Sequence, residues 1–317
     1  MWNLLLSVGV LGAAALAGPY VLGPLRERLE PRALAQGGFV RVGGYELHYT
    51  DEGPRDGPPV LLLHGFAAWA FTWRAQRAAL ARAGFRAISV DQLGYGASPR
   101  PAEAVYTTTH QAELMLGVLD ALGVARAHVV GHSFGGRIAL AMAQAAPGRV
   151  VSLALLCPEA FTVERPPVAA WLRVPLLGYA LAFYTTAPAL VPTGLGMVVR
   201  QRGWMTDEAI QGYAAPLRVR GSAAAQVWQG RSPKDGGWSV PERLGEVAAP
   251  ALLLWGAEDP VFPADDGRKL AALLPDARLH LLDGVGHLPH EEDEPATTAA
   301  LLEFLTQRRR DAEAQGL

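Results

Sequence analysis

The feature that most constrains this chain is a serine placed between an apolar run and a helical pattern of small residues. Ala127 to Val130 predicts a strand, Gly136 to Ala146 predicts a helix, and Gly131-His132-Ser133-Phe134-Gly135 joins them. Such a turn strains the backbone at the serine and needs glycine wherever a side chain would collide with the neighbouring strand or helix. We therefore expect Gly131, His132 and Gly135 to form an elbow that presents the Ser133 hydroxyl.

A serine hydroxyl is a weak nucleophile near neutral pH, so it needs a base, a carboxylate that orients the base, and donors for an oxyanion. Pro250 to Trp255 predicts a buried strand with Asp259 in the loop after it. Arg278 to Leu282 predicts the next strand, and His287 follows it. The order Ser133, Asp259, His287 thus supplies a nucleophile, an acid and a base.

The oxyanion donors are expected after another apolar strand. His64-Gly65-Phe66 follows Pro59 to Leu63, so the backbone N–H groups of Phe66 and Phe134 are the predicted donors. We interpret His64 as a structural residue of this turn and His132 as a packing residue beside the nucleophile.

Together these segments resemble the α/β-hydrolase family. Its chain order of serine, acid and histidine is present, Asp91-Gln92-Leu93-Gly94-Tyr95-Gly96-Ala97-Ser98 matches its D-x-x-G-x-G-x-S segment, and Gly286-His287 matches its histidine loop. The resemblance implies an α/β fold with a mostly parallel, doubly wound, eight-stranded sheet and a helical cap inserted after the sixth strand. It also implies a serine hydrolase that needs no cofactor and no metal.

Several residues compete for these roles. Glu159 follows the predicted strand Val151 to Leu156, where some hydrolases carry the acid, and it stays open as an alternative to Asp259. Asp265 and Asp266 fit the first turn of a helix, where carboxylates suit the dipole. His290 is a rival base, but only His287 follows a small Gly-Val-Gly turn. The remaining nearby acids are interpreted as solvated loop charges: Glu52, Asp56, Glu291, Glu292 and Asp293.

The predicted organisation is one catalytic core interrupted by a cap. A chain of 317 residues, half of them apolar, can bury one large core. The expected parts are an anchor or signal segment (1–25), a linker (26–37), the core (38–157 and 242–310), the cap (158–241) and a tail (311–317). The first half of the cap is rich in large apolar residues that an insertion of this size cannot bury internally. We expect some of them to line a pocket or face a membrane, which favours an acyl chain as ligand.

The segment from Trp2 to Leu25 contains no charged side chain, and it is long enough to span a bilayer. An uncleaved anchor would place the protein at the bacterial inner membrane. Ala15-Leu16-Ala17 also resembles a signal cleavage site, which would make the protein secreted or periplasmic, and an interfacial helix is the third possibility. Three arginines at positions 26, 28 and 32 follow the segment and favour a cytoplasmic catalytic domain, although the orientation stays open.

Composition excludes other classes. The net charge is −2, and the basic run Arg308 to Arg310 lies in a predicted helix end, so nucleic acid is not an expected partner. Cys157 is the single cysteine and ends an apolar strand, so we expect packing rather than a disulfide or a metal cluster.

The resulting hypothesis is a membrane-associated serine hydrolase of carboxylic esters with medium or long acyl chains, such as monoacylglycerol. The same triad also serves carbon–carbon bond hydrolases, perhydrolases and proline aminopeptidases. Carbon–carbon hydrolases resembling this chain often have tryptophan after the histidine, where this chain has Leu288. An aminopeptidase needs cap acids for the substrate amine, and the first half of this cap offers only Glu159 and Glu164. A ligand-binding receptor or scaffold that retains the fold is the non-enzymatic alternative.

Overall fold

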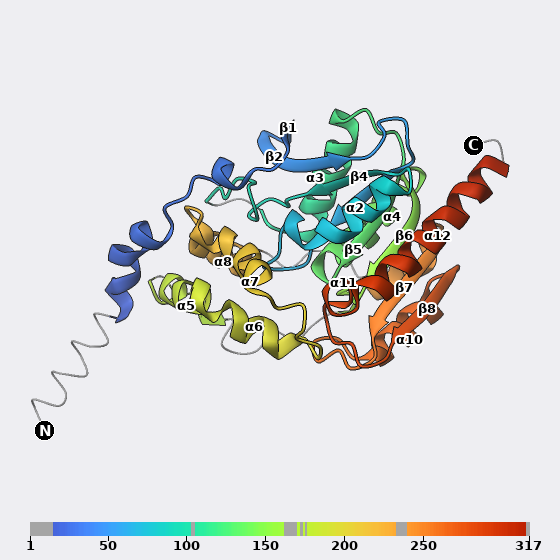
Figure 1. Ribbon diagram of the computed structural model, residues 1–317. Helices are drawn as coiled ribbons and strands as arrows, with labels where there is room; N and C mark the ends of the chain where they lie inside the picture. The colour runs from blue at the N-terminus through green and yellow to red at the C-terminus, as the bar shows by residue number, and fades with distance from the viewer. Residues whose placement is uncertain are drawn as a thin grey trace, which may run out of the picture.

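An eight-stranded sheet forms the centre of the protein, with helices on both of its faces (Figure 1). The computed structural model describes residues 15–102, 105–161, 170–171, 174, 176–232 and 240–314. The spatial order is β1-β2-β4-β3-β5-β6-β7-β8, and every pair from β4 onward is parallel. The strands are β1 (Gly38–Val42), β2 (Tyr45–Glu52), β3 (Pro59–Leu63), β4 (Arg86–Val90), β5 (Ala127–His132), β6 (Val150–Leu156), β7 (Ala251–Gly256) and β8 (Ala277–Leu282). The expected mostly parallel sheet is confirmed.

The first two strands form an antiparallel hairpin. Val42 pairs with Tyr45 across Gly43 and Gly44, which have φ angles of 57° and 85°. Glycine adopts such left-handed angles at little cost, which is why this pair can close the turn. β2 then pairs antiparallel with β4 and joins the hairpin to the parallel strands.

Helices cover the two faces of the sheet because the inner strands are apolar on both sides. On one face lie α3 (Thr108–Ala121), α4 (Phe134–Ala145) and α10 (Ala264–Leu273), which bury Met115, Ile138 and Leu270. On the other lie α2 (Arg74–Arg82) and α12 (Glu294–Ala314), which bury Leu80 and Leu305. The short elements of the core are η2 (Ala70–Trp73), η3 (Pro147–Arg149), η7 (Leu244–Glu246) and α11 (Pro289–Glu292).

The alternation of strand and helix stops after β6, where the helical insertion was predicted. The chain then forms α5 (Leu177–Thr185), η5 (Pro188–Leu190), α6 (Val191–Val198), α7 (Asp207–Ala214), η6 (Ala215–Arg218), α8 (Ser222–Arg231) and α9 (Val240–Arg243) before it enters β7. In Figure 1, α5, α6, α7 and α8 lie together beside the sheet, away from α12.

The amino-terminal segment is only partly described. Residues 1–14 of the predicted anchor lie outside the described residues, and residues 15–26 are helical. In the described part of the chain no single helix meets the length and apolarity of a membrane span; α5 and Pro188–Val198 meet them only as a pair bent by 52°. Residues 26–29, expected in the linker, bond to the insertion: Leu29 accepts from the Arg220 N–H and donates to the Arg218 carbonyl. η1 (Pro31–Leu34) follows.

Buried histidines make stability depend on pH. His128 lies on β5 with Nδ1 2.8 Å from Ser152 Oγ, and burial, with smaller effects from two arginines, lowers its pKa to about 4. The unfolded chain binds a proton at this residue near pH 6.5, so the free energy of unfolding falls as the pH drops through this window. We expect His128→Asn, which keeps a polar atom near Ser152, to remove about 3 kcal/mol of that fall by pH 4. Denaturant unfolding of the wild type and the variant at pH 7 and pH 4 measures this change in stability. An equal loss of unfolding free energy in both proteins would contradict the prediction.

Candidate active site

Ser133 occupies the sharp turn between β5 and α4. Its φ of 50° and ψ of −116° are sparsely populated for any residue with a Cβ, which is the strain expected of an elbow. A Cβ on Gly131 would lie 2.5 Å from the Gly135 carbonyl oxygen, and one on Gly135 would overlap the Leu63 carbonyl oxygen. Both glycines are therefore required by close backbone approach.

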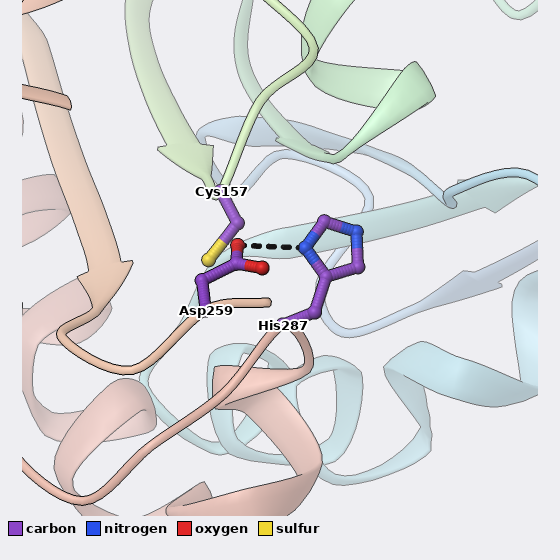
Figure 2. Close-up of side chains that lie close together, drawn as sticks. All are labelled: Cys157, Asp259 and His287. Atoms are coloured by element: carbon purple, nitrogen blue, oxygen red, sulfur yellow. Dashed lines mark hydrogen bonds and ion pairs between the residues drawn. The ribbon is translucent and has the colours of Figure 1, made fainter. Parts of the chain in front are cut away.

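The structure brings the three predicted catalytic side chains into one line. His287 Nε2 lies 3.1 Å from Ser133 Oγ, and His287 Nδ1 lies 2.8 Å from Asp259 Oδ2. Figure 2 shows the second of these contacts, with the Asp259 carboxylate facing the imidazole. The residues follow β5, β7 and β8, whose carboxyl ends share one edge of the sheet. All three are less than 10% exposed, so little water competes for these bonds.

Asp259 is held so that only one of its oxygens faces the histidine. Its Oδ1 accepts hydrogen bonds from the backbone N–H groups of Val261 at 2.7 Å and Phe262 at 3.1 Å. The remaining oxygen accepts from His287, which assigns the imidazole proton to Nδ1 and leaves the Nε2 lone pair toward Ser133. The arrangement can remove a proton from the serine hydroxyl.

The rival residues have other partners. Glu159 lies 3.0 Å from Arg137, while both nitrogens of His287 are already occupied by Ser133 and Asp259. Asp265 and Asp266 are on α10 and pair with Arg268 and Lys269. The structure therefore places Asp259, and not these acids, on the histidine.

The two other histidines near the triad are kept neutral. His290 Nε2 lies 2.7 Å from Thr72 Oγ1, and burial, with smaller effects from Arg74 and His287, lowers its pKa to about 3. His132 is buried, as a packing residue should be, and its Nε2 also bonds to the His287 carbonyl at 2.8 Å. Burial lowers the pKa of His132 well below its usual range. The histidine bonded to Ser133 Oγ is His287, and the bonds of these two rings go to other partners.

The turn after β3 holds the first of the two predicted oxyanion donors, Phe66. In the described part of the chain, the N–H groups of Phe66 and Phe134 donate to no protein acceptor. His64 braces the turn: its Nδ1 lies 2.8 Å from the Gly65 carbonyl oxygen and its Nε2 accepts from the Gln92 N–H at 3.1 Å. The structural role expected of His64 is confirmed.

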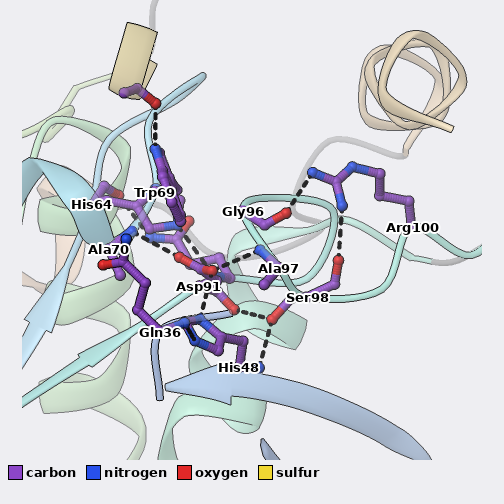
Figure 3. A network of polar contacts seen from close by, with 12 residues as sticks. Gln36, His48, His64, Trp69, Ala70, Asp91, Gly96, Ala97, Ser98 and Arg100 are labelled. Atoms are coloured by element: carbon purple, nitrogen blue, oxygen red, sulfur yellow. Dashed lines mark hydrogen bonds and ion pairs between the residues drawn. The ribbon is translucent and has the colours of Figure 1, made fainter. Parts of the chain in front are cut away.

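Asp91 is the anchor of this region (Figure 3). It is fully buried and its Oδ1 accepts from the Ala70 N–H at 2.7 Å, while Oδ2 contacts His48 Nδ1 at 2.8 Å and the Ala97 N–H at 2.7 Å. These bonds keep the pKa of Asp91 below its usual value despite burial, which opposes them. The carboxylate ties the segment after β3 to the segment after β4.

The expectation that Glu291 and Glu292 are solvated is wrong, since each is only 7% exposed. Glu291 forms a two-pronged ion pair with Arg74 and accepts from the Tyr213 hydroxyl at 2.8 Å. Both carboxylates thereby link the core to the insertion. No local pattern indicates this burial, because the partners come from distant segments.

Glu292 is the functional candidate that the sequence analysis missed. One oxygen accepts from the backbone N–H groups of Gly286, Arg200 and Gln201 at 2.9, 2.6 and 3.0 Å, and the other accepts from Leu288 at 3.0 Å. Gly286 and Leu288 flank His287. The carboxylate therefore sets the position of the histidine loop and fastens it to the end of α6.

We expect Glu292→Gln to lower both stability and turnover. The amide would direct an NH₂ donor at backbone donors, costing about 2–4 kcal/mol in the free energy of unfolding. The displaced imidazole should reduce kcat about 10- to 100-fold with a smaller change in KM. Glu303→Gln, on the exposed side of α12, is the matched control. Wild-type kcat in the Glu292 variant would exclude a positioning role.

A metal has poor ligands here. Donor atoms of Cys157, Asp259 and His287 lie within 4.8 Å of one another, as Figure 2 shows for the side chains. Burial, with a smaller effect from the Asp259 charge, raises the pKa of the Cys157 thiol well above its usual range, whereas metals bind the thiolate. The His287 nitrogen that faces this cluster already bonds to Asp259. The atoms of Cys157, Asp259 and His287 are therefore poor ligands for a metal ion, and the contact between Asp259 and His287 fits a catalytic triad better.

Comparison with known proteins identifies the family. The model of the alpha/beta hydrolase fold family matches residues 58–294, which include Ser133, Asp259, His287 and the two predicted oxyanion donors. This chain belongs to the α/β-hydrolase fold family. The hydrolase is 30% identical over 271 residues to a 2-hydroxy-6-oxononadienedioate/2-hydroxy-6-oxononatrienedioate hydrolase of Comamonas testosteroni, covering 83% of this chain and 92% of the relative.

Solved structures add two further similarities. A membrane phospholipase A, described as a bacterial virulence factor, superposes with a TM-score of 0.74 at 25% identity, covering 98% of this hydrolase and 99% of that chain. A thermophilic esterase from Thermogutta terrifontis superposes with a TM-score of 0.71 at 25% identity, and the match covers 86% of this hydrolase and 99% of the esterase.

Proposed function

We propose that this hydrolase cleaves carboxylic esters through an acyl-enzyme on Ser133, and that its substrates are lipid-like acyl esters such as monoacylglycerol. The observation that carries the chemistry is the line from Ser133 Oγ through His287 to Asp259, with spacings of 3.1 and 2.8 Å. The backbone N–H groups of Phe66 and Phe134, which have no protein acceptor in the described part of the chain, complete the set of groups that acyl transfer requires.

The reaction follows from these positions. Ser133 Oγ attacks the ester carbonyl while His287 Nε2 takes its proton, and Asp259 stabilises the imidazolium. The Phe66 and Phe134 N–H groups stabilise the negative oxygen, a contribution of several kcal/mol. Collapse of the intermediate expels the alcohol, which takes the proton from His287. Water then loses a proton to His287 and attacks the acyl-enzyme, and the acid leaves as Ser133 regains its proton.

Support for an acyl chain comes from the insertion and the amino terminus. No charged residue lies between Arg173 and Arg200, so α5 and α6 carry no charged side chain, and most of their side chains are apolar. The charge-free segment from Trp2 to Leu25 supports membrane association at a bacterial inner membrane, where such esters reside. The similarity to a membrane phospholipase A extends over 98% of this chain, which includes most of that segment.

A carbon–carbon bond hydrolase is the second candidate. Curated relatives with 29–32% identity bear names of 2-hydroxy-6-oxo dienoate hydrolases, and the sequence comparisons support this candidate better than the ester. Against it stands Leu288 after the histidine, where such enzymes often have tryptophan. The triad can serve either reaction, so substrate preference must decide.

Competing substrates separate the two candidates. The purified full chain is assayed with p-nitrophenyl esters of graded acyl length, with monoacylglycerol, and with 2-hydroxy-6-oxo-6-phenylhexa-2,4-dienoate. We expect kcat/KM for medium or long esters to exceed that for the dienoate at least about 100-fold. The reverse ratio would establish the second candidate, and a steep optimum at acetyl would refute the lipid substrate. Absence of labelling by a fluorophosphonate would refute an activated serine and leave a binding protein.

A further inference from the structure

The amino-terminal helix, residues 15–26, lies against α5 of the insertion. The rings of Tyr20 and Tyr179 have centroids 4.8 Å apart, and the Tyr184 hydroxyl donates to the Ala15 carbonyl at 3.2 Å. The Arg26 guanidinium lies 3.7 Å from the centre of the Phe183 ring and donates to the Phe183 carbonyl. Figure 1 places this helix beside α5 on the side away from the carboxyl terminus.

A buried carboxylate fastens this helix to the insertion. Glu27 is 5% exposed, and it accepts from the Gly221 N–H at 2.9 Å and from the Ala223 N–H at 3.1 Å. Both donors belong to the start of α8, where a negative charge also suits the helix dipole. Arg26 contacts the same carboxylate at 2.8 Å. Buried polar contacts therefore join the helix to the insertion.

The amino-terminal helix and the insertion both expose large apolar side chains. From the amino-terminal helix, Val21, Leu22 and Leu25 are 69%, 47% and 56% exposed. From the insertion, Leu176, Leu190 and Met197 are 58%, 47% and 72% exposed. Single exposed apolar residues are ordinary, but large ones gathered on two adjoining, charge-free segments indicate an interaction surface. We call these six residues the apolar face.

The amino-acid sequence indicates what covers this face. The charge-free stretch runs from Trp2 through residue 15, where the described helix meets Tyr184 of α5. A lipid phase that holds this stretch therefore also reaches α5. Arginines border the face, with Arg28 after the amino-terminal helix and Arg202 after α6, and both are exposed. Cations beside an apolar surface suit anionic lipid headgroups.

We propose that the amino-terminal helix and the α5–α6 part of the insertion form one lipid-docking face, so that the insertion itself rests on the bilayer. The inference deepens the proposed lipid-ester function, because an insertion seated in lipid would take its substrate from that phase. It also goes beyond an anchor at residues 2–25, because an anchor alone does not require Leu190 or Met197 to contact lipid.

The test measures contact of α6 with lipid. Met197→Cys in the full chain is labelled with an environment-sensitive fluorophore, since Cys157 is buried, and reconstituted into phosphatidylcholine–phosphatidylglycerol vesicles. The matched control is Leu273→Cys, at the end of α10, which is 41% exposed. We expect quenching by spin-labelled lipids to be at least about threefold stronger at residue 197 than at residue 273. Equal quenching at the two positions would overturn the proposal.

Two additional measurements separate the possible failures. A label at Leu22→Cys that is quenched while the label at residue 197 is not would mean that only the amino-terminal segment enters lipid, which refutes the docking face. Turnover of a medium-chain p-nitrophenyl ester is recorded on the same samples. Turnover without quenching at residue 197 refutes the docking face alone, whereas quenching without turnover refutes the proposed esterase and supports the face.

Discussion

Ser133→Ala should reduce ester turnover at least about 10,000-fold while the protein stays folded, because no other group in the line can form the acyl-enzyme. The substitution keeps the Cβ and so leaves the strained turn, with its φ of 50°, unchanged. It removes one hydrogen bond, of 3.1 Å, to His287. The free energy of unfolding should therefore change by only about 1 kcal/mol. Steady-state kinetics and denaturant unfolding measure the two quantities.

Ser152→Ala is the matched control for this variant. Ser152 is also a buried serine bonded to a histidine, with Oγ 2.8 Å from His128 Nδ1, but it lies on β6 away from the elbow. It should lose about 1 kcal/mol of stability and keep its turnover. Ester turnover that survives in Ser133→Ala would show that the nucleophile has been assigned to the wrong residue.

Asp259→Asn should lower kcat by about 10,000-fold without displacing the histidine, because it reverses the tautomer of His287. The N–H groups of Val261 and Phe262 both donate to Oδ1, so the asparagine must keep its carbonyl oxygen there. Its NH₂ group then faces His287 Nδ1, which has to accept and therefore loses its proton. The proton moves to Nε2, which can no longer receive one from Ser133.

Two substitutions are controls for this effect. Glu159→Gln tests the rival acid, and it should keep turnover within about threefold because Glu159 pairs with Arg137. Asp283→Asn changes an exposed carboxylate next to β8 and should be neutral. A large loss in Glu159→Gln together with near-normal turnover in Asp259→Asn would transfer the acid role to Glu159. Nuclear magnetic resonance of the imidazole protons would report the tautomer directly.

Much of the site could be predicted because its parts obey local rules. The elbow at Ser133 follows from steric demands within five residues, because a side chain at Gly131 or Gly135 would overlap neighbouring backbone atoms. Asp259 and His287 each follow a buried parallel strand, and parallel strands end at a common sheet edge. The helical insertion after β6 is likewise confirmed.

The missed features depend on contacts between distant segments. Glu291 and Glu292 stand among charged residues and have the local composition of a solvated loop. They are buried because the insertion returns to the core and supplies Tyr213 to the first and the Arg200 and Gln201 N–H groups to the second, across 92 and 91 residues for Glu292. The contact of Glu27 with α8 spans 194 residues and was missed for the same reason.

Residue order alone was sufficient to predict the parallel sheet and to select Ser133 and His287 as side chains at one edge of it, since apolar periodicity and glycine placement act over a few neighbouring positions. Folding in three dimensions decided which carboxylate faces His287, which charges are withdrawn from water, and how residues 15–29 join the insertion. Such choices depend on donors and acceptors that meet only after the chain has closed large loops, and no short stretch of residues encodes where those loops close.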